Sequence, residues 1–268
     1  MEILKLTEKY ERHPRVRKFA DKIKDACALH IKGLIGSLDA LFLAGTVKNT
    51  DKAHLLILSD KEEAAYFYND ANNLLPNEKV YFLSSSYKRS IQFSQEDPTN
   101  IILRTEVLNA VRNNEKCVIV TYPEAIFEKV ISKTDIAKQT LQIKQGEKIS
   151  TDFLNDVLFE YGFEQVDFVY EPGQFSIRGS IIDIFSFSDD HPYRIDFFGE
   201  EVESIREFDV ENQLSINTLN EAVIQPKLQN PENQGAYQWQ SIFEFINPGT
   251  LTWISDFSYI SQRIRDLF

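Results

Sequence analysis

The sequence predicts an α/β protein with a parallel-sheet domain and an inserted α+β domain built on an antiparallel sheet. Residues 27–130 alternate short apolar runs with helix-length segments, which is typical of a parallel sheet with helices packed on both faces. Residues 166–207 hold strand-length apolar runs separated by short turn sequences, and spacers this short favour antiparallel neighbours. A chain of 268 residues also exceeds one typical domain.

The first half is expected to form helices and strands in turn. Ser37 and Asp60 precede two of the helical segments and are plausible N-cap residues, because their side chains can accept hydrogen bonds from free backbone N–H groups. The helices are predicted at 1–26, 38–47, 60–75, 103–113 and 123–130. The strands are predicted at 27–34, 54–58, 79–83 and 117–122.

The junction at residues 33–40 has the layout of a phosphate-binding loop: a strand, a glycine-rich turn and a helix N-terminus. A working P-loop would continue with Gly-Lys-Ser or Gly-Lys-Thr, but the chain reads LDA at residues 38–40. Asp39 would repel a triphosphate, and no hydroxyl remains for magnesium. The sequence therefore predicts a degenerate phosphate loop in a P-loop-NTPase-like domain, or else an unrelated strand-to-helix turn. The loop residues are Gly33, Gly36, Ser37 and Asp39.

The second half begins with an edge strand at 140–149 and an amphipathic helix at 150–161, capped by Ser150 or Thr151. A meander of five strands follows. In one of these strands Ser176 and Arg178 lie on one face of the sheet, and Phe175 and Ile177 lie on the other. The five strands are predicted at 166–170, 174–178, 180–187, 193–198 and 202–207.

Three parts of this meander carry a family resemblance: EPGQFSIRG at 171–179, IDIF at 182–185 and RIDFFGEEVESIR at 194–206. They resemble the second domain of the UvrB excision-repair family, and more closely the matching domain of the Mfd family of transcription-repair coupling factors. The degenerate loop favours the second family. The resemblance implies a first domain at 1–130, a UvrA-binding α+β domain at 131–212, and a return segment to the first domain at 213–268.

The same resemblance implies that one face of the antiparallel sheet binds UvrA. Arg178 stands at the arginine of the FxxRG motif, and Phe175, Phe185 and Arg194 are its neighbours in the motif. Two alternatives stay open: Arg178 could form a salt bridge inside its own domain, and the two phenylalanines could belong to the core. Ser176 occupies a place where UvrB tends to have an arginine, which affects the strength of the interface and not its location.

The resemblance also implies what lies outside this chain. A full-length relative would bind RNA polymerase and DNA, and would translocate by using ATP and magnesium in a C-terminal motor. We therefore expect a fragment that is cytoplasmic, non-catalytic and free of cofactors. UvrB carries an aromatic hairpin that inserts into DNA. Here residues 84–100 are expected to form a short polar loop, with Tyr87 and Phe93 as its aromatics.

Charge and composition separate the competing hypotheses. Residues 1–150 contain 23 Lys and Arg against 20 Asp and Glu, whereas residues 151–268 contain 6 against 21. An acidic second half disfavours a stand-alone nucleic-acid binder, because phosphate contacts need Lys and Arg. The other alternative is a nucleotide-dependent motor fragment of the UvrB type. Cys27 and Cys117 are interpreted as buried thiols, and the histidines show no metal-ligand spacing.

Overall fold

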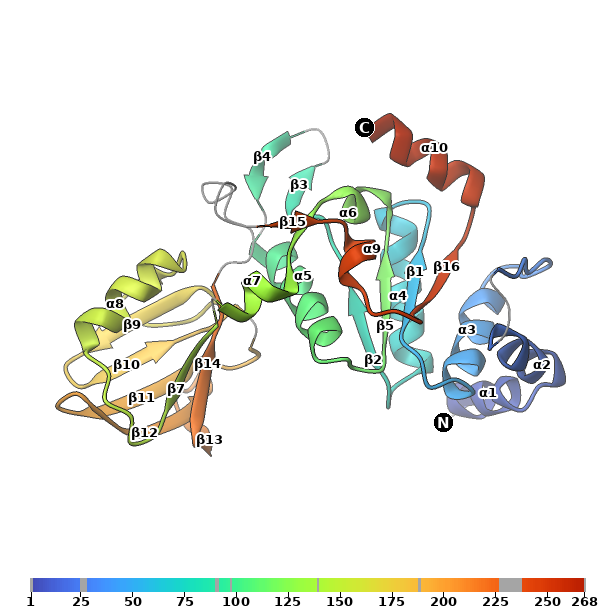
Figure 1. Ribbon diagram of the computed structural model, residues 1–268. Helices are drawn as coiled ribbons and strands as arrows, with labels where there is room; N and C mark the ends of the chain where they lie inside the picture. Colours follow the sequence, from blue (N-terminus) through green and yellow to red (C-terminus); the bar gives the residue numbers. More distant parts are fainter. Residues whose placement is uncertain are drawn as a thin grey trace. The chain divides into compact units, whose positions relative to one another are not determined.

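The computed structural model describes residues 2–24, 28–89, 92–96, 98–138, 140–187, 189–226 and 238–267. The chain forms two compact units: Met1–Lys129 with Ser241–Phe268, and Val130–Gln240 (Figure 1). The second unit is therefore inserted into the first. The boundary expected at residue 212 falls inside the second unit, because three further strands follow it there.

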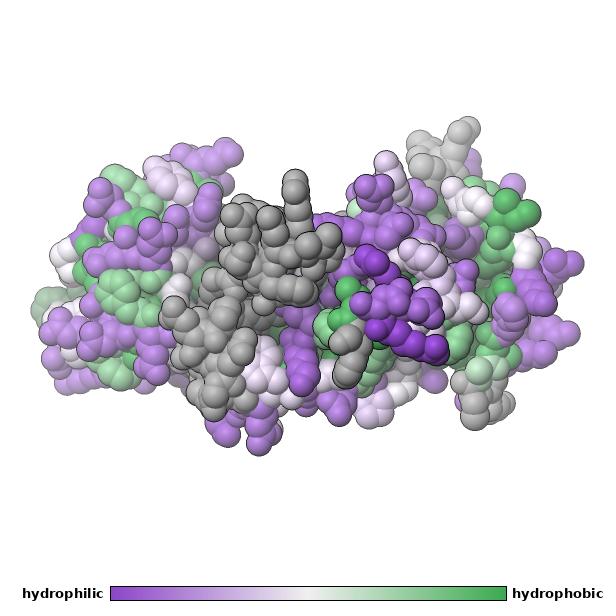
Figure 2. All heavy atoms as spheres, turned by 90° about the horizontal axis from the view of Figure 1, so that it is seen from above, coloured by the Kyte–Doolittle hydropathy of each residue, from purple (hydrophilic) through white to green (hydrophobic). Residues whose placement is uncertain are grey.

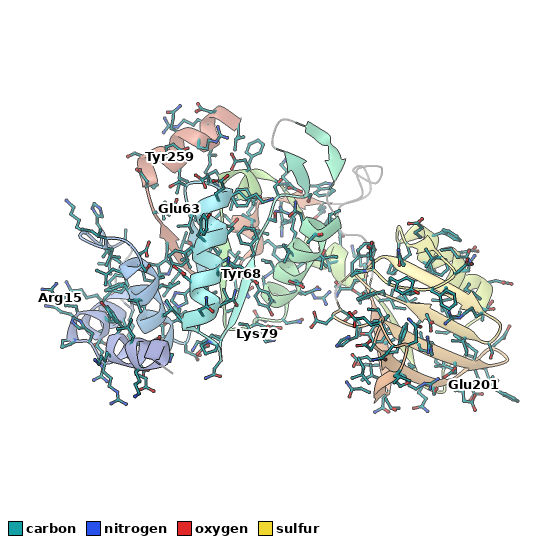
Figure 3. All side chains as sticks on the ribbon, turned by 180° about the vertical axis from the view of Figure 1, so that it is seen from behind. Arg15, Glu63, Tyr68, Lys79, Glu201 and Tyr259 are labelled. Atoms are coloured by element: carbon teal, nitrogen blue, oxygen red, sulfur yellow. The ribbon has the colours of Figure 1, made fainter. Side chains whose placement is uncertain are left out.

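Unit 1 is built around a four-stranded sheet in the order β16-β1-β5-β2, in which every pairing is parallel. The predicted α/β alternation is confirmed here, and β1 and β5 are fully buried as short apolar runs should be. Tyr68 of α4, labelled in Figure 3, packs its ring 5.5 Å from that of Phe82 on β2. The strands are β1 (His54–Ile57), β2 (Lys79–Phe82), β5 (Cys117–Thr121) and β16 (Leu251–Ile254).

The helices of unit 1 largely follow the predicted segments. Asp60 caps α4 by accepting a hydrogen bond from Glu63 N at 2.8 Å. Ser37 precedes α3 as expected, but its side chain makes no capping hydrogen bond. The first predicted helix is two helices, because Pro14 starts a new one. The bounds are α1 (Glu2–Glu11), α2 (Pro14–Ile23), α3 (Leu38–Lys48), α4 (Lys61–Leu74), α5 (Pro98–Arg112), α6 (Pro123–Phe127), α9 (Ile242–Phe245) and α10 (Phe257–Leu267).

Two further predictions for unit 1 are wrong. Residues 28–34 form no strand, so α3 follows an irregular segment; Cys27 lies outside the described residues. The polar loop expected at 84–100 contains an antiparallel hairpin of β3 (Tyr87–Arg89) and β4 (Gln92–Glu96). Pairing of these two strands satisfies backbone groups that an open loop would leave to water.

A buried histidine joins the C-terminal segment to the rest of unit 1. His54 on β1 is 0% exposed, and its Nδ1 accepts a hydrogen bond from the indole N–H of Trp253 on β16 at 3.0 Å. Since an indole only donates, the imidazole proton is on Nε2, which lies 3.0 Å from the Thr50 hydroxyl. Burial lowers the pKa of His54 to about 4.

Unit 2 contains a six-stranded sheet in the order β13-β12-β11-β10-β9-β8, antiparallel except between β8 and β9. The predicted meander is confirmed from β9 onward. Residues 166–170, predicted as a strand, form a loop instead, and β13 and β14 were not predicted. The strands of this sheet are β8 (Glu164–Gln165), β9 (Gln174–Arg178), β10 (Ile181–Ile184), β11 (Tyr193–Phe198), β12 (Glu201–Phe208) and β13 (Ser215–Leu219).

The remaining elements complete unit 2. Helix α8 lies on the apolar side of the sheet, and Ser150 caps it as predicted. Figure 2 shows hydrophobic residues as separate patches among hydrophilic ones on the face drawn. These elements are β6 (Val130–Ile131), α7 (Lys133–Lys138), β7 (Leu141–Lys144), α8 (Thr151–Glu160), β14 (Glu221–Ile224) and β15 (Trp239–Gln240), paired as β14 with β7 and β15 with β6.

Candidate protein-docking site

The sheet of unit 2 has one apolar and one polar face, because side chains alternate along each strand. Residues directly opposite on antiparallel strands share a face, so the register of the strand pairs identifies the residues of each face. Ile182 on β10 pairs with Ile177 and Ile195 on the neighbouring strands, and these belong to the apolar face that packs with α8. We call the other side the polar face; it carries Ser176, Arg178, Asp183, Arg194, Asp196 and Arg206.

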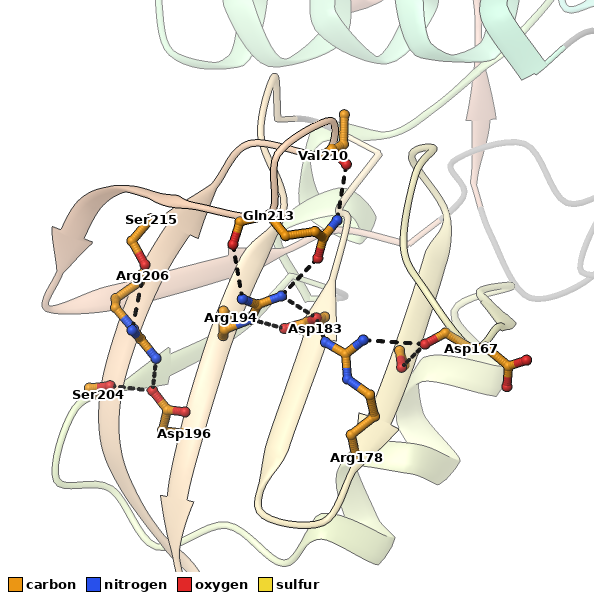
Figure 4. A network of polar contacts seen from close by, with 11 residues as sticks. Asp167, Arg178, Asp183, Arg194, Asp196, Ser204, Arg206, Val210, Gln213 and Ser215 are labelled. Carbon is orange, nitrogen blue, oxygen red and sulfur yellow. Dashed lines mark hydrogen bonds and ion pairs between the residues drawn. The ribbon is translucent and has the colours of Figure 1, made fainter.

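One buried carboxylate organises the centre of the polar face (Figure 4). The Asp183 side chain is 1% exposed and lies between two arginines. Arg194 donates Nε–H and Nη2–H to its two oxygens at 2.7 and 2.8 Å, and Arg178 Nη2 pairs with Oδ2. The hydrogen bonding of the Arg194 guanidinium to Asp183 is the main reason that the pKa of Arg194 is raised. Both guanidinium groups are thus held in fixed orientations.

Each of the two arginines also makes contacts with residues other than Asp183. Arg194 also donates to the main-chain oxygen of Gln213 at 3.3 Å and to its side-chain oxygen at 3.0 Å, and it lies 4.2 Å from the ring centroid of Phe208. Arg178 donates to the Asp167 carbonyl at 3.4 Å and lies 5.0 Å from the ring centroid of Phe168. Arg178 remains the more accessible of the two, with a side chain 34% exposed against 16% for Arg194.

The intradomain salt bridge that the sequence left open for Arg178 is therefore present. The salt bridge leaves the Arg178 side chain partly exposed. Because one carboxylate pairs with two guanidinium groups, the three side chains together keep a net positive charge. A second pair on the same face joins Arg206 to Asp196 at 2.5 Å, and Asp196 also accepts from the Ser204 hydroxyl at 2.6 Å.

Phe175 and Phe185 are not accessible, so the core alternative holds for both. Phe175 alternates with Ser176 and Arg178 and therefore points to the apolar face, where it is 0% exposed and meets the ring of Phe159 at 5.3 Å. Phe185, directly after β10, packs with Val169 and Phe208 in a small second core. Neither phenylalanine can contact a partner without unfolding of the sheet.

Phe198 is an exposed aromatic that the sequence analysis missed. It is 80% exposed at the end of β11, beside the turn that leads to Glu201. Arg194, Asp196 and Phe198 are spaced by two residues along one strand, so they share the polar face. Phe197 confirms this alternation, because it is buried in the apolar core. Alternation along this strand, counted in steps of two residues from Arg194, predicts that Phe198 lies on the polar face.

The residues predicted to form a degenerate phosphate loop lie in unit 1, around the start of α3. Gly33 and Gly36 have φ values of +86° and +59°, which lie in the left-handed region that glycine favours. Asp39 is in the first turn of α3, and its carboxylate accepts a hydrogen bond from Ala40 N at 2.7 Å. Burial raises the pKa of Asp39, against the opposing effect of its backbone hydrogen bonds. A carboxylate thus lies at the N-terminus of α3.

Other chemistry receives little support from the described residues. Within them, no group of three His, Cys, Asp or Glu side chains is arranged to hold a metal ion. Burial raises the pKa of the Cys117 thiol to about 11, which disfavours the reactive thiolate. Among the described helices, none has both the length and the apolar character that a bilayer crossing requires.

Comparison with known families agrees with this architecture. Residues 141–229 match the family model described as the UvrB interaction domain, and this range includes the whole polar face. Unit 2 is therefore a UvrB interaction domain on a sheet whose polar face carries fixed arginines.

The chain is homologous to the N-terminal region of transcription-repair-coupling factors. It is 32% identical to that of Bacillus subtilis over 197 residues, which are 73% of this chain and 17% of the relative. The Rickettsia bellii protein is 31% identical over 192 residues, or 69% and 17% of the two chains. The Escherichia coli K12 protein is 28% identical over 146 residues, or 53% and 13%. The chain therefore spans about one sixth of the length of the curated relatives it matches.

Proposed function

We propose that this chain is a non-catalytic recruitment module that binds UvrA through the polar face of unit 2 during transcription-coupled nucleotide excision repair. The match of residues 141–229 to the UvrB interaction domain carries the proposal. Arg178, Arg194 and Phe198 are the residues of this face assigned to the contact. In the longer protein, RNA polymerase and DNA would be bound by other parts, and an ATP-dependent motor there would supply movement.

The chemistry of the face supports a protein partner. Arginine and aromatic side chains dominate the binding energy of many protein interfaces. Arg178 and Arg194 are pre-oriented by Asp183, so little side-chain entropy is lost on docking. Their shared positive charge suits an acidic group on the partner, while the rest of residues 151–268 is acidic. That surrounding charge would direct such a partner to this face and away from its flanks.

Charge reversal at Arg178 tests the docking site. Arg178→Glu should weaken UvrA binding in a calorimetric titration by about 30-fold or more, because a carboxylate would then face the acidic group proposed on the partner. Lys144→Glu makes the same charge change on β7, away from the polar face, and should leave the affinity within about twofold. Equal affinities for wild type and Arg178→Glu, with both proteins folded by circular dichroism, would refute the site.

The competing function is a nucleotide-dependent motor fragment of the UvrB type. Asp39 argues against it, because a carboxylate stands at the start of α3 where the P-loop pattern has its lysine. The irregular segment before α3 also lacks the strand that delivers a P-loop to its helix.

A thermal-shift assay separates the two functions. Millimolar ATP with magnesium should leave the unfolding temperature unchanged, since a ligand stabilises a protein only as far as it binds the folded state. A P-loop ATPase serves as the positive control. A magnesium-dependent rise of several degrees in this protein would restore the motor hypothesis and remove the non-catalytic assignment.

A further inference from the structure

A short loop beside the polar face is held rigidly although it belongs to no strand. Residues 166–171 connect β8 to β9 through the turn at Gly173. The Gln174 side-chain oxygen accepts hydrogen bonds from the backbone N–H groups of Tyr170 and Glu171 at 2.9 and 3.0 Å. The Asp167 carbonyl accepts from the Ser176 hydroxyl at 2.9 Å. These bonds tie both halves of the loop to β9.

The middle of the loop is anchored by packing. Val169 is 1% exposed and lies in the second core with Phe185 and Phe208. Its two neighbours point the other way: Phe168 is 52% exposed and Tyr170 is 58% exposed. Two large aromatic rings are thus presented to solvent by a backbone that is fixed at its ends and its centre. An aromatic pair held in this way needs little further ordering to bind.

The aromatic pair is continuous with the arginines. Phe168 lies against the Arg178 guanidinium, and Arg178 shares Asp183 with Arg194. A partner that engages these cations would meet the Phe168 ring in the same contact. Aromatic and arginine side chains that adjoin in this way form the usual centre of a protein interface.

We propose that residues 166–171 form a second contact area for the docking partner, with Phe168 and Tyr170 as its apolar anchors. This inference rests on the proposed function and adds the chemistry of the partner. The partner surface would combine a carboxylate facing Arg178 with an adjacent apolar recess that receives the two rings. The occupant is the same protein that binds the polar face, because the cation–aromatic contact joins the two areas.

Titration with purified UvrA tests the contact area. Phe168→Ala and Tyr170→Ala should each weaken binding by about tenfold, and the double variant by more, because hot-spot side chains commonly contribute on this scale. The heat-capacity change of binding should become less negative in the double variant, since less apolar surface is buried. Tyr170→Ala is the sharper probe, because no ring contact with Arg178 is lost. Phe153→Ala is a matched control: Phe153 is 54% exposed on α8, which packs on the opposite side of the sheet.

The outcomes distinguish this inference from the proposed function. If Arg178→Glu weakens binding while the double aromatic variant stays within twofold of wild type, the contact area is wrong and the docking function stands. If the wild-type chain does not bind UvrA, the proposed function itself fails. If Phe153→Ala weakens binding as strongly as Tyr170→Ala, the effect is not specific to the loop and the inference is overturned.

Discussion

Replacement of Asp183 by asparagine should lower the free energy of unfolding by about 3 kcal/mol, because it leaves two adjacent arginines without the carboxylate that neutralises them. The Asp183 side chain is 1% exposed, so water cannot replace the lost partner. Asparagine keeps the shape of the side chain, but it removes the charge and replaces one acceptor oxygen with an amide NH2 group that only donates. Urea unfolding followed by circular dichroism measures the loss.

Asp196→Asn is the matched control on the same face. Asp196 pairs with Arg206, whose side chain is 35% exposed, and such accessible pairs contribute under about 1 kcal/mol. The Asp183 variant should also weaken UvrA binding, since Arg178 and Arg194 lose their fixed orientation. Similar losses of stability in both variants would show that Asp183 does not have the central role assigned to it.

Acidification from pH 6.5 to pH 4 should lower the free energy of unfolding of unit 1 by about 3 kcal/mol through protonation of His54 alone. The ordinary pKa of histidine is 6.5 and burial lowers that of His54 to about 4, so the unfolded chain takes up a proton at a higher pH than the folded one. The contribution is therefore fully present above pH 6.5 and is lost as the pH falls towards 4. Protonation of Nδ1 would also set two donors against each other at the Trp253 indole.

His54→Gln isolates this effect. The variant is expected to be less stable at neutral pH, and its stability should depend less steeply on pH between 4.5 and 6.5. His191→Gln, at an exposed site, should keep the wild-type slope. Trp253 fluorescence reports the event directly, because the indole touches the titrating ring. Parallel slopes for wild type and His54→Gln would contradict the assignment.

Alternation along the strands made much of unit 2 predictable. The step of two residues placed Ser176 and Arg178 together and left Phe175 on the other side, so the burial of Phe175 followed from the same pattern that identified the face. Phe198 was within reach of this rule as well. Asp183 was a weaker signal, because a single charge in an apolar run does not tell which partners neutralise it.

Other features depended on contacts that sequence patterns do not encode. Residues 166–170 read VDFVY, a run that favours a strand. After the Val166 N–H bond to Phe175 on β9, however, the side chains of Gln174 and Ser176 hold their backbone. β13 (SINTL) is almost entirely exposed and offered no apolar alternation. The salt bridge of Arg178 required knowing the β9–β10 register, in which Asp183 lies opposite Ser176 and diagonally across from Arg178.

The pairing of β1 with β16 has a consequence for biosynthesis. Residues 54–57 emerge from the ribosome nearly 200 residues before their neighbour at 251–254, and an entire nested domain is translated in between. Until residues 251–254 are made, β1 remains an unpaired edge strand of the nascent sheet. Exposed strand edges of this kind promote aggregation. The nested domain is fully translated by residue 240, before β16 is made. We expect co-translational folding to run inside-out, with the outer domain completed last.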